Sequence, residues 1–146
     1  MYFVTFAITN WVVLFIRNEC KEIVLNSIRF CQEDKDLEVY AWIMMTSHLH
    51  LIIGSKGNAL SNIMSNLKSH SSEMLHIAIA KNTNESRREW LLPMYRTEGE
   101  KHHNKFQFWQ AERHPIALIT AKIACQKLVY IHKNPVEAGF VKYTNA

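Results

Sequence analysis

The sequence predicts a single domain of the α+β class. Three observations predict it: an aromatic and β-branched run at the N-terminus, stretches with a helical period of apolar residues, and two strand-like runs close together in the chain. At 146 residues and 48% hydrophobic, the chain is long enough for one domain with a core and too short for two ordinary ones. We therefore expect residues 1–146 to fold as one unit.

The chain begins with a predicted strand and a predicted helix. Tyr2–Thr9 is rich in aromatic and β-branched residues, as expected of a strand buried on at least one face. Glu19–Asp34 follows with apolar residues at helical spacing.

The apolar N-terminal stretch is shorter than the ~20 residues that a membrane helix needs, and its first basic residue is Arg17, unlike in a signal peptide. We therefore expect no contact with a membrane.

Two strand-like runs come next, Leu37–Met44 and His48–Ile53, and the stretch between them has the length of a hairpin loop. Because side chains alternate between the two faces of a strand, His48 and His50 share one face of the second run. The leucines that alternate with them are then free to pack on a core. The histidines should face away from that core.

A second helix and two polar connections are predicted after this hairpin. Ala59–Ala80 has the apolar period of a helix. Lys81–Arg88 and Arg96–Lys105 are polar throughout, which is typical of solvated segments. We expect both to be mobile loops.

The last third should contain a short strand and a helix. Phe106–Trp109 is a short aromatic run with strand character. His114 and Pro115 favour a helix start, and apolar spacing continues that helix from Ile116 to about His132. Pro135 should stop it.

Charge and cysteine content exclude only a few classes of function. Lys and Arg total 17 against 13 Asp and Glu, and the formal charge of +4 favours contact with a polyanion without requiring it. The three cysteines are odd in number and far apart in the chain. They predict neither a disulfide framework nor a structural zinc cluster, and a reducing cytoplasm fits them best.

The histidine pair is a candidate metal site. Two imidazoles on one face of a strand can both reach one ion, and a third oxygen or nitrogen ligand would complete an open site for Mg²⁺, Mn²⁺ or Zn²⁺. The alternative is that His48 and His50 are two partly buried histidines held by hydrogen bonds.

Tyr130 is a candidate nucleophile in the predicted C-terminal helix. Asn134 lies one helical turn further on, so its amide oxygen could join the ion while Tyr130 attacks a phosphate held by that ion. Attack would leave a 5′-phosphotyrosine link and a free 3′-hydroxyl, a nearly reversible exchange that needs no nucleotide cofactor. The alternative is a core tyrosine whose hydroxyl finds one partner.

Four further residues are candidates for contact with nucleic acid. Lys68, Lys105 and Lys133 could meet backbone phosphates, and the ring of Trp109 could stack on an unpaired base. Against this, lysines commonly lie on a solvated surface, and tryptophans commonly belong to the core.

Three segments carry a resemblance to a known family. They are Ile43–Ile52, which contains the histidine pair, Phe108–Gln110 with His114 and Pro115 after it, and Tyr130–Val141. In order and spacing the chain resembles the HUH single-tyrosine transposases, especially the REP-associated tyrosine transposases. It departs from them at Thr46-Ser47, where relatives commonly have Pro-Asn.

The resemblance implies a ferredoxin-like α/β sandwich with a central antiparallel sheet and a C-terminal helix that bears the tyrosine. It implies that His48, His50 and Asn134 bind Mg²⁺ or Mn²⁺ and that Tyr130 is the nucleophile. Members cleave single-stranded DNA beside hairpins or repeats, and many are dimers, so we expect a homodimer that nicks and rejoins such DNA.

Two alternatives to a transposase remain. One is a regulator derived from such an enzyme, which binds DNA hairpins without cutting them. The other is a small zinc hydrolase that uses His48 and His50, although no acidic general base lies beside them in the sequence, as it does in a His-Glu-x-x-His helix.

Overall fold

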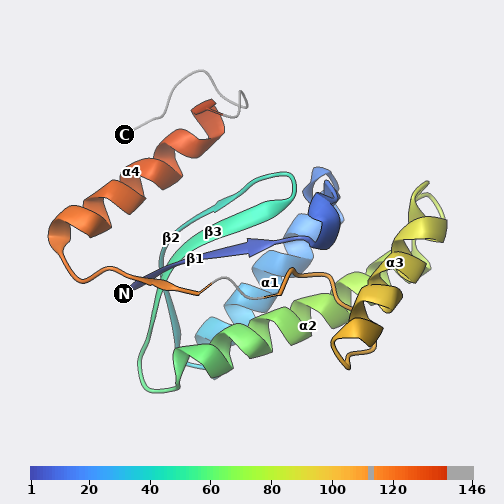
Figure 1. The fold of residues 1–146 in the computed structure, drawn as a ribbon, viewed down its shortest axis with the longest axis horizontal. Helices are drawn as coiled ribbons and strands as arrows, with labels where there is room; N and C mark the ends of the chain where they lie inside the picture. The colour runs from blue at the N-terminus through green and yellow to red at the C-terminus, as the bar shows by residue number, and fades with distance from the viewer. Residues whose placement is uncertain (112–113, 138–146) are drawn as a thin grey trace.

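The computed structural model describes residues 1–111 and 114–137, with the backbone alone for 134–137. Its centre is an antiparallel sheet in which the strand order is β2-β3-β1-β4. The strands are β1 (Tyr2–Ala7), β2 (Leu37–Met44), β3 (His48–Ser55) and β4 (Ile116–Ala117). The helices are α1 (Asn18–Asp34), α2 (Leu60–Lys81), α3 (Arg88–Lys101) and α4 (Ala121–Glu137). This order of strands and crossing helices is the ferredoxin-like arrangement, and the prediction is confirmed (Figure 1).

One face of the sheet packs on α1 and α2 and forms the main core. Leu49, Leu51 and Ile53 of β3 are at most 1% exposed there. They alternate with the histidines, as a strand with two different faces requires. Val4 and Phe6 of β1 extend the same apolar layer. Burial of each such side chain stabilises the fold by about 1.5–3 kcal/mol.

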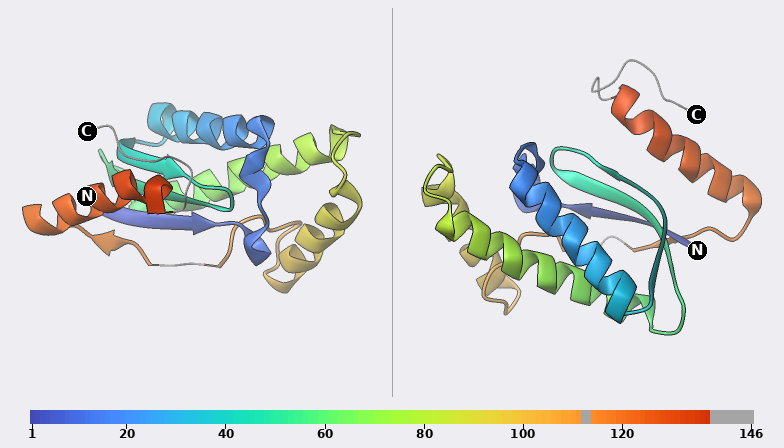
Figure 2. Two further views of the ribbon diagram at one scale, coloured as in Figure 1. Left: turned by 90° about the horizontal axis from the view of Figure 1, so that it is seen from above. Right: turned by 180° about the vertical axis from the view of Figure 1, so that it is seen from behind.

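The opposite face of the sheet carries α4 (Figure 2). Its buried apolar cluster is small and consists of Phe3, Ile52 and Ile131. Ala41, Ile43 and Leu118 pack against this cluster from its rim. The helix is therefore held on the sheet by few fully buried groups.

The connection between α2 and α3, predicted to be a solvated loop, contains a buried ion cluster instead. The Glu85 carboxylate accepts hydrogen bonds from Arg87 Nε at 2.9 Å and Arg17 Nε at 3.1 Å, and its side chain is 3% exposed. The hydrogen bond from Arg87, opposed by burial and assisted by Arg17, lowers the pKa of Glu85 to about 2. Arg87 also donates to the carbonyl of Val13. The cluster therefore ties the start of α3 to the segment before α1.

The prediction of a polar loop over 96–105 is wrong for residues 96–101, because α3 continues to Lys101. Leu91, Tyr95 and Gly99 are the buried residues of α3, and their four-residue spacing is the helical signal. A glycine is required at the last of these positions. A Cβ on Gly99 would lie 2.5 Å from the Cα of Phe106.

The predicted start and end of the last helix are also wrong. Ile116 pairs with Phe3 in the sheet, so the chain is still extended there. The helix begins at Ala121, where Thr120 accepts a hydrogen bond from the Ile123 amide as an N-cap. The helix runs through Pro135 to Glu137. Because proline has no N–H, the last turn of α4 lacks the hydrogen bond to the carbonyl four residues before Pro135.

Two further observations complete the fold. Phe106–Trp109 forms no regular strand, although Trp109 makes a single antiparallel bridge to Ile8. Among the described residues, no helix is both long and apolar enough to span a bilayer.

Candidate active site

The histidine pair lies on the α4 face of the sheet, as the alternation in β3 predicted. The imidazole centroids of His48 and His50 are 4.9 Å apart. On the neighbouring strand β1, Ala7 lies opposite His48 and Thr5 lies opposite His50. The Thr5 hydroxyl and Nδ1 of His50 are 2.8 Å apart and share a hydrogen bond. The ring of His50 is therefore held in a defined orientation, and the residue is 6% exposed.

Tertiary packing brings Tyr130 to these histidines. The Tyr130 ring lies 5.3 Å from the His50 ring and 5.9 Å from the Phe3 ring, measured between centroids. Phe3 in turn stacks on His50 at 5.4 Å. Tyr130 is nevertheless 41% exposed, so its phenol is accessible from solvent. A buried imidazole and an accessible phenol thus lie side by side, from two elements distant in the chain.

The donor set suits a metal ion that still needs another ligand. Because Nδ1 of His50 is bonded to Thr5, the nitrogen of this ring that would bind an ion is Nε2. This is how metal-binding histidines are usually oriented, through a hydrogen bond at the other ring nitrogen. In the part of the chain that the structure describes, no three residues among His, Cys, Asp and Glu gather as a metal site. A third protein ligand would have to be of another type, such as Asn134, whose side chain lies outside the described residues.

Two residues that lie beside the site were not predicted from the sequence to belong to it. Lys127 lies on α4, and its Nζ is 4.7 Å from the Phe3 ring centroid and 5.8 Å from that of Tyr130. In the sequence, the spacing of three residues between Lys127 and Tyr130 already indicates that the two side chains share one face of a helix. A cation beside the phenol can stabilise negative charge that develops on its oxygen or on a nearby phosphate.

The second missed residue is Trp11. Its ring lies 5.9 Å from that of His48, and 48% of the residue is exposed. Asn10 and Trp11 have φ values of 57° and 54°, in the left-handed region that side chains other than glycine seldom adopt. Such backbone conformations often occur at functional sites. No sequence pattern signals this conformation.

A family model for IS200-like transposases matches residues 8–111. The chain belongs to the IS200-like transposase family. The match covers the histidine pair and ends before Tyr130. No curated protein matches the chain.

Two solved structures share the fold of this transposase-family chain. A REP-associated tyrosine transposase bound to a REP hairpin is 18% identical, with a TM-score of 0.67 over 97% of this chain and 69% of that one. A protein from Deinococcus radiodurans assigned as a transposase is 15% identical, with a TM-score of 0.55 over 89% of this chain and 86% of that one. The first alignment extends over nearly the whole chain and so confirms the α+β architecture beyond the family match.

The predicted DNA contacts of this transposase-family chain lie in two places. Lys68 and Lys105 line one cavity on the α2 side of the sheet, while Lys133 is exposed on α4. Trp109 also reaches that cavity but is only 3% exposed. Its Nε1 donates to Ser71 Oγ at 2.8 Å, and its ring contacts Phe6. Base stacking on Trp109 is therefore not supported, because its ring belongs to the core.

Proposed function

We propose that the protein is a metal-dependent, single-stranded DNA transposase that nicks and rejoins DNA through Tyr130. The observation that carries this proposal is the contact between the rings of Tyr130 and His50 at 5.3 Å, next to a second histidine at 4.9 Å. A nucleophile and two imidazole ligands within one small region are what cleavage of a phosphodiester needs. Membership of the IS200-like transposase family supports the same reaction.

The bond changes follow from the chemistry of a phenol and a phosphodiester. The Tyr130 oxygen loses its proton to a base or to water and attacks the phosphorus. The bond from phosphorus to the 3′-oxygen breaks, and that oxygen leaves and takes up a proton. The 5′-phosphate is then joined to the tyrosine. One phosphodiester has replaced another, so a different 3′-hydroxyl can attack in the reverse sense and complete strand transfer without a nucleotide cofactor.

The neighbours of Tyr130 have separate roles in this proposal. Lys127 lies 5.8 Å from the Tyr130 ring and stabilises negative charge at the phenol and the phosphate. Phe3 stacks on His50 and supports its ring from one side. The Thr5 hydroxyl holds the same ring through Nδ1. All three act through position and charge.

His48 and His50 would hold the divalent ion, with Asn134 as the proposed third ligand. When bound, the ion polarises the scissile phosphate and offsets charge in the transition state. Imidazole donors suit Mn²⁺ better than Mg²⁺, which prefers oxygen ligands. We therefore propose Mn²⁺ as the better of the two expected ions.

We propose DNA with hairpin or repeat elements as the substrate, because the similar solved structure is described as bound to a REP hairpin. A homodimer and a cytoplasmic location, both expected from the sequence, stay predictions. Light scattering of the purified protein at several concentrations tests the dimer.

The test is formation of a covalent adduct. The protein is incubated with Mn²⁺ and end-labelled hairpin oligonucleotides from the flanks of its own gene, and the products are separated on denaturing gels. We expect a protein–DNA adduct that is absent in Tyr130→Phe and with a chelator. Tyr40→Phe is the matched control, since Tyr40 is also exposed but lies on β2.

Two outcomes would contradict the proposal. Tight hairpin binding without any adduct would favour the non-cutting regulator. Chelator-sensitive hydrolysis of esters or peptides that survives in Tyr130→Phe would favour the zinc hydrolase.

A further inference from the structure

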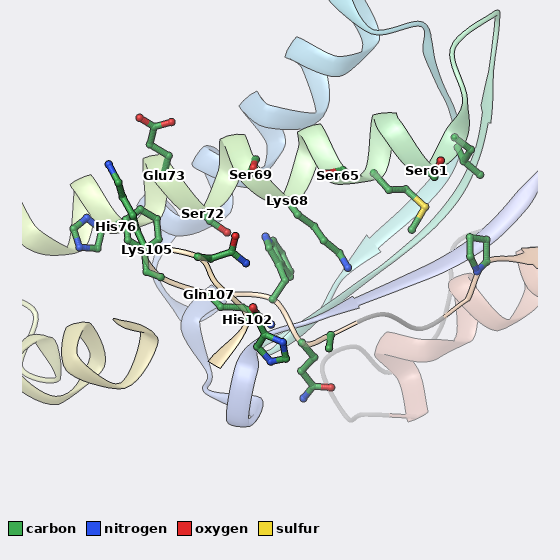
Figure 3. A pocket seen from close by; sticks show the side chains of 18 of the residues that line it. Ser61, Ser65, Lys68, Ser69, Ser72, Glu73, His76, His102, Lys105 and Gln107 are labelled. Carbon is green, nitrogen blue, oxygen red and sulfur yellow. The ribbon is translucent and has the colours of Figure 1, made fainter. Parts of the chain in front are cut away.

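A surface with a cavity lies on the α2 side of the sheet, and the histidine pair is not among its lining residues. It encloses about 820 Å³ between α2 and the chain that follows α3 (Figure 3). We call it the α2 groove. Its lining includes Ser65, Lys68, Ser72 and His76 of α2, and Lys105 and Gln107 of the opposite wall. Its volume is in the range of sites that hold a ligand.

The side chains of the α2 groove are suited to an extended anion. Lys68 extends from α2 into the hollow, with its Nζ 5.4 Å from the Phe6 ring centroid (Figure 3). Lys105 stands on the opposite wall, and Glu73 is the acidic residue among the described lining. The remaining polar groups are hydroxyls, amides and imidazoles, which can donate hydrogen bonds to phosphate oxygens. Successive groove residues on α2 are three or four positions apart, so donors recur along its length.

The positive charge of the α2 groove comes from the lysines and not from His76. The His76 ring stacks on Phe106 at 4.2 Å between centroids. Burial and the charge of Arg96 lower the pKa of His76, which favours the neutral imidazole. Together, His76 and Phe106 form a flat, uncharged surface in the groove wall.

The α2 groove adjoins a smaller hollow that is lined by Trp11. This hollow of about 260 Å³ shares His102, Gln107 and Gln110 with the groove. The Trp11 ring contacts that of His48 at 5.9 Å. Trp11 therefore lies both at the smaller hollow and beside the histidine pair.

We propose that the α2 groove binds the single-stranded DNA next to the nicked phosphodiester, with backbone phosphates on Lys68 and Lys105. This deepens the proposed function and rests on it, since the same DNA strand would enter the site of Tyr130. The lysines fix the strand through charge and tolerate any base sequence.

The lysines are tested by charge removal with a matched control. Lys68→Gln and Lys105→Gln remove one cation each from the groove, and Lys81→Gln removes one from the exposed end of the same helix α2, outside the cavity. Anisotropy of a labelled 20-nucleotide single strand is measured over a range of salt concentrations. We expect each groove variant to raise Kd by about three- to tenfold and to reduce the salt slope by about 0.7. Lys81→Gln should change Kd less than about twofold.

A second pair of variants tests DNA binding in the groove and leaves both lysines unchanged. Ser65 and Asn62 are both exposed on α2, but only Ser65 lines the cavity. Ser65→Glu should weaken binding at least as much as Lys68→Gln, because it places a negative charge against the phosphates. Asn62→Glu should have little effect. Equal effects of the two glutamates would overturn the proposal.

The outcomes separate this proposal from the proposed function. If the groove variants weaken binding but form the Tyr130 adduct at the wild-type rate when DNA is saturating, both proposals stand. If neither the wild-type protein nor any variant forms an adduct but binding still depends on Lys68 and Lys105, the strand-transfer proposal fails, and only the assignment of single-stranded DNA to the α2 groove stands. If adduct forms while the groove variants bind like Lys81→Gln, the groove proposal is overturned. Binding of the mononucleotide dAMP as tightly as the 20-mer would also overturn it, in favour of a pocket for free nucleotides.

Discussion

The two faces of the sheet differ in how much they bury and in what they carry. On the α1/α2 face, Leu49, Leu51 and Ile53 belong to a large apolar cluster. On the α4 face, the same strand presents His48 and His50, and the described residues form a buried apolar cluster of three there. One strand thus contributes stability on one side and chemistry on the other. The candidate active site can therefore be altered with little loss of stability, because the main core lies on the other face.

The largest effect should come from the main core. Leu51→Ala removes a side chain that is 0% exposed and should lower the free energy of unfolding by about 2–5 kcal/mol. Urea denaturation followed by circular dichroism measures it. Leu128→Ala, at a position that is 38% exposed on α4, is the control and should cost much less. Equal losses in the two variants would refute the contrast between the faces.

The buried ion cluster should give the next largest effect, and its effect should depend on pH. The pKa of Glu85 is lowered from its ordinary value of 4.5 to about 2, so its contribution is complete above pH 4.5 and is lost as the pH falls to 2. That shift corresponds to about 3 kcal/mol. Glu85→Gln should therefore lower stability at pH 7 by about this amount, and the difference from wild type should shrink toward pH 2.

Glu98→Gln is the matched control for this charge. Glu98 pairs with Lys101 at 3.0 Å, but the lysine side chain is 61% exposed. Solvent screens such a pair, so its loss should cost under about 1 kcal/mol. Thermal denaturation of both variants from pH 2 to pH 7 makes the comparison. If Glu85→Gln lowered stability by the same amount at every pH, the shape of the Glu85 side chain, and not its charge, would determine its contribution to stability.

A smaller and more local effect is expected for the attachment of α4. Ile131 is 5% exposed and belongs to the small cluster with Phe3 and Ile52. Ile131→Ala should loosen α4 and lower the hydrogen-exchange protection of its amides by about tenfold or more, whereas α1 and α2 keep theirs. Val129→Ala, at a position 49% exposed on the same helix, is the control. Loss of protection in α1 as well would mean that the two faces unfold together.

The smallest effect on stability should come from removal of the Thr5 hydroxyl, which is hydrogen-bonded to His50. Thr5→Val keeps the shape of the side chain and removes the hydrogen bond to Nδ1. Stability should fall by only about 1 kcal/mol. Mn²⁺ binding, measured by titration calorimetry, should weaken by about tenfold because the ring loses its fixed orientation. Thr83→Val in an exposed position is the control, and unchanged Mn²⁺ affinity in Thr5→Val would remove Thr5 from the site.

Segments with a clear apolar period were predictable, whereas segments with mixed signals were not. The alternation in His48–Ile53 and the helical spacing in Ala59–Ala80 correctly predicted β3 and α2. The helix α3 was missed because its buried residues are few and because it contains Pro93, a residue that usually interrupts a helix. The strand β4 was missed because a two-residue strand has no period of its own and forms only where β1 is available to pair with it.

The sequence by itself determined which side chains of each element share a face, and so it placed His48 and His50 together on the side away from the main core. Only the tertiary structure decided that Tyr130 lies against His50, that Trp11 and Lys127 flank these rings, and that α2 faces Lys105 across a groove. The physical reason is that alternation within an element follows from backbone geometry over a few neighbouring residues. Contacts between distant segments depend on packing summed over the whole chain, which no short stretch of sequence contains.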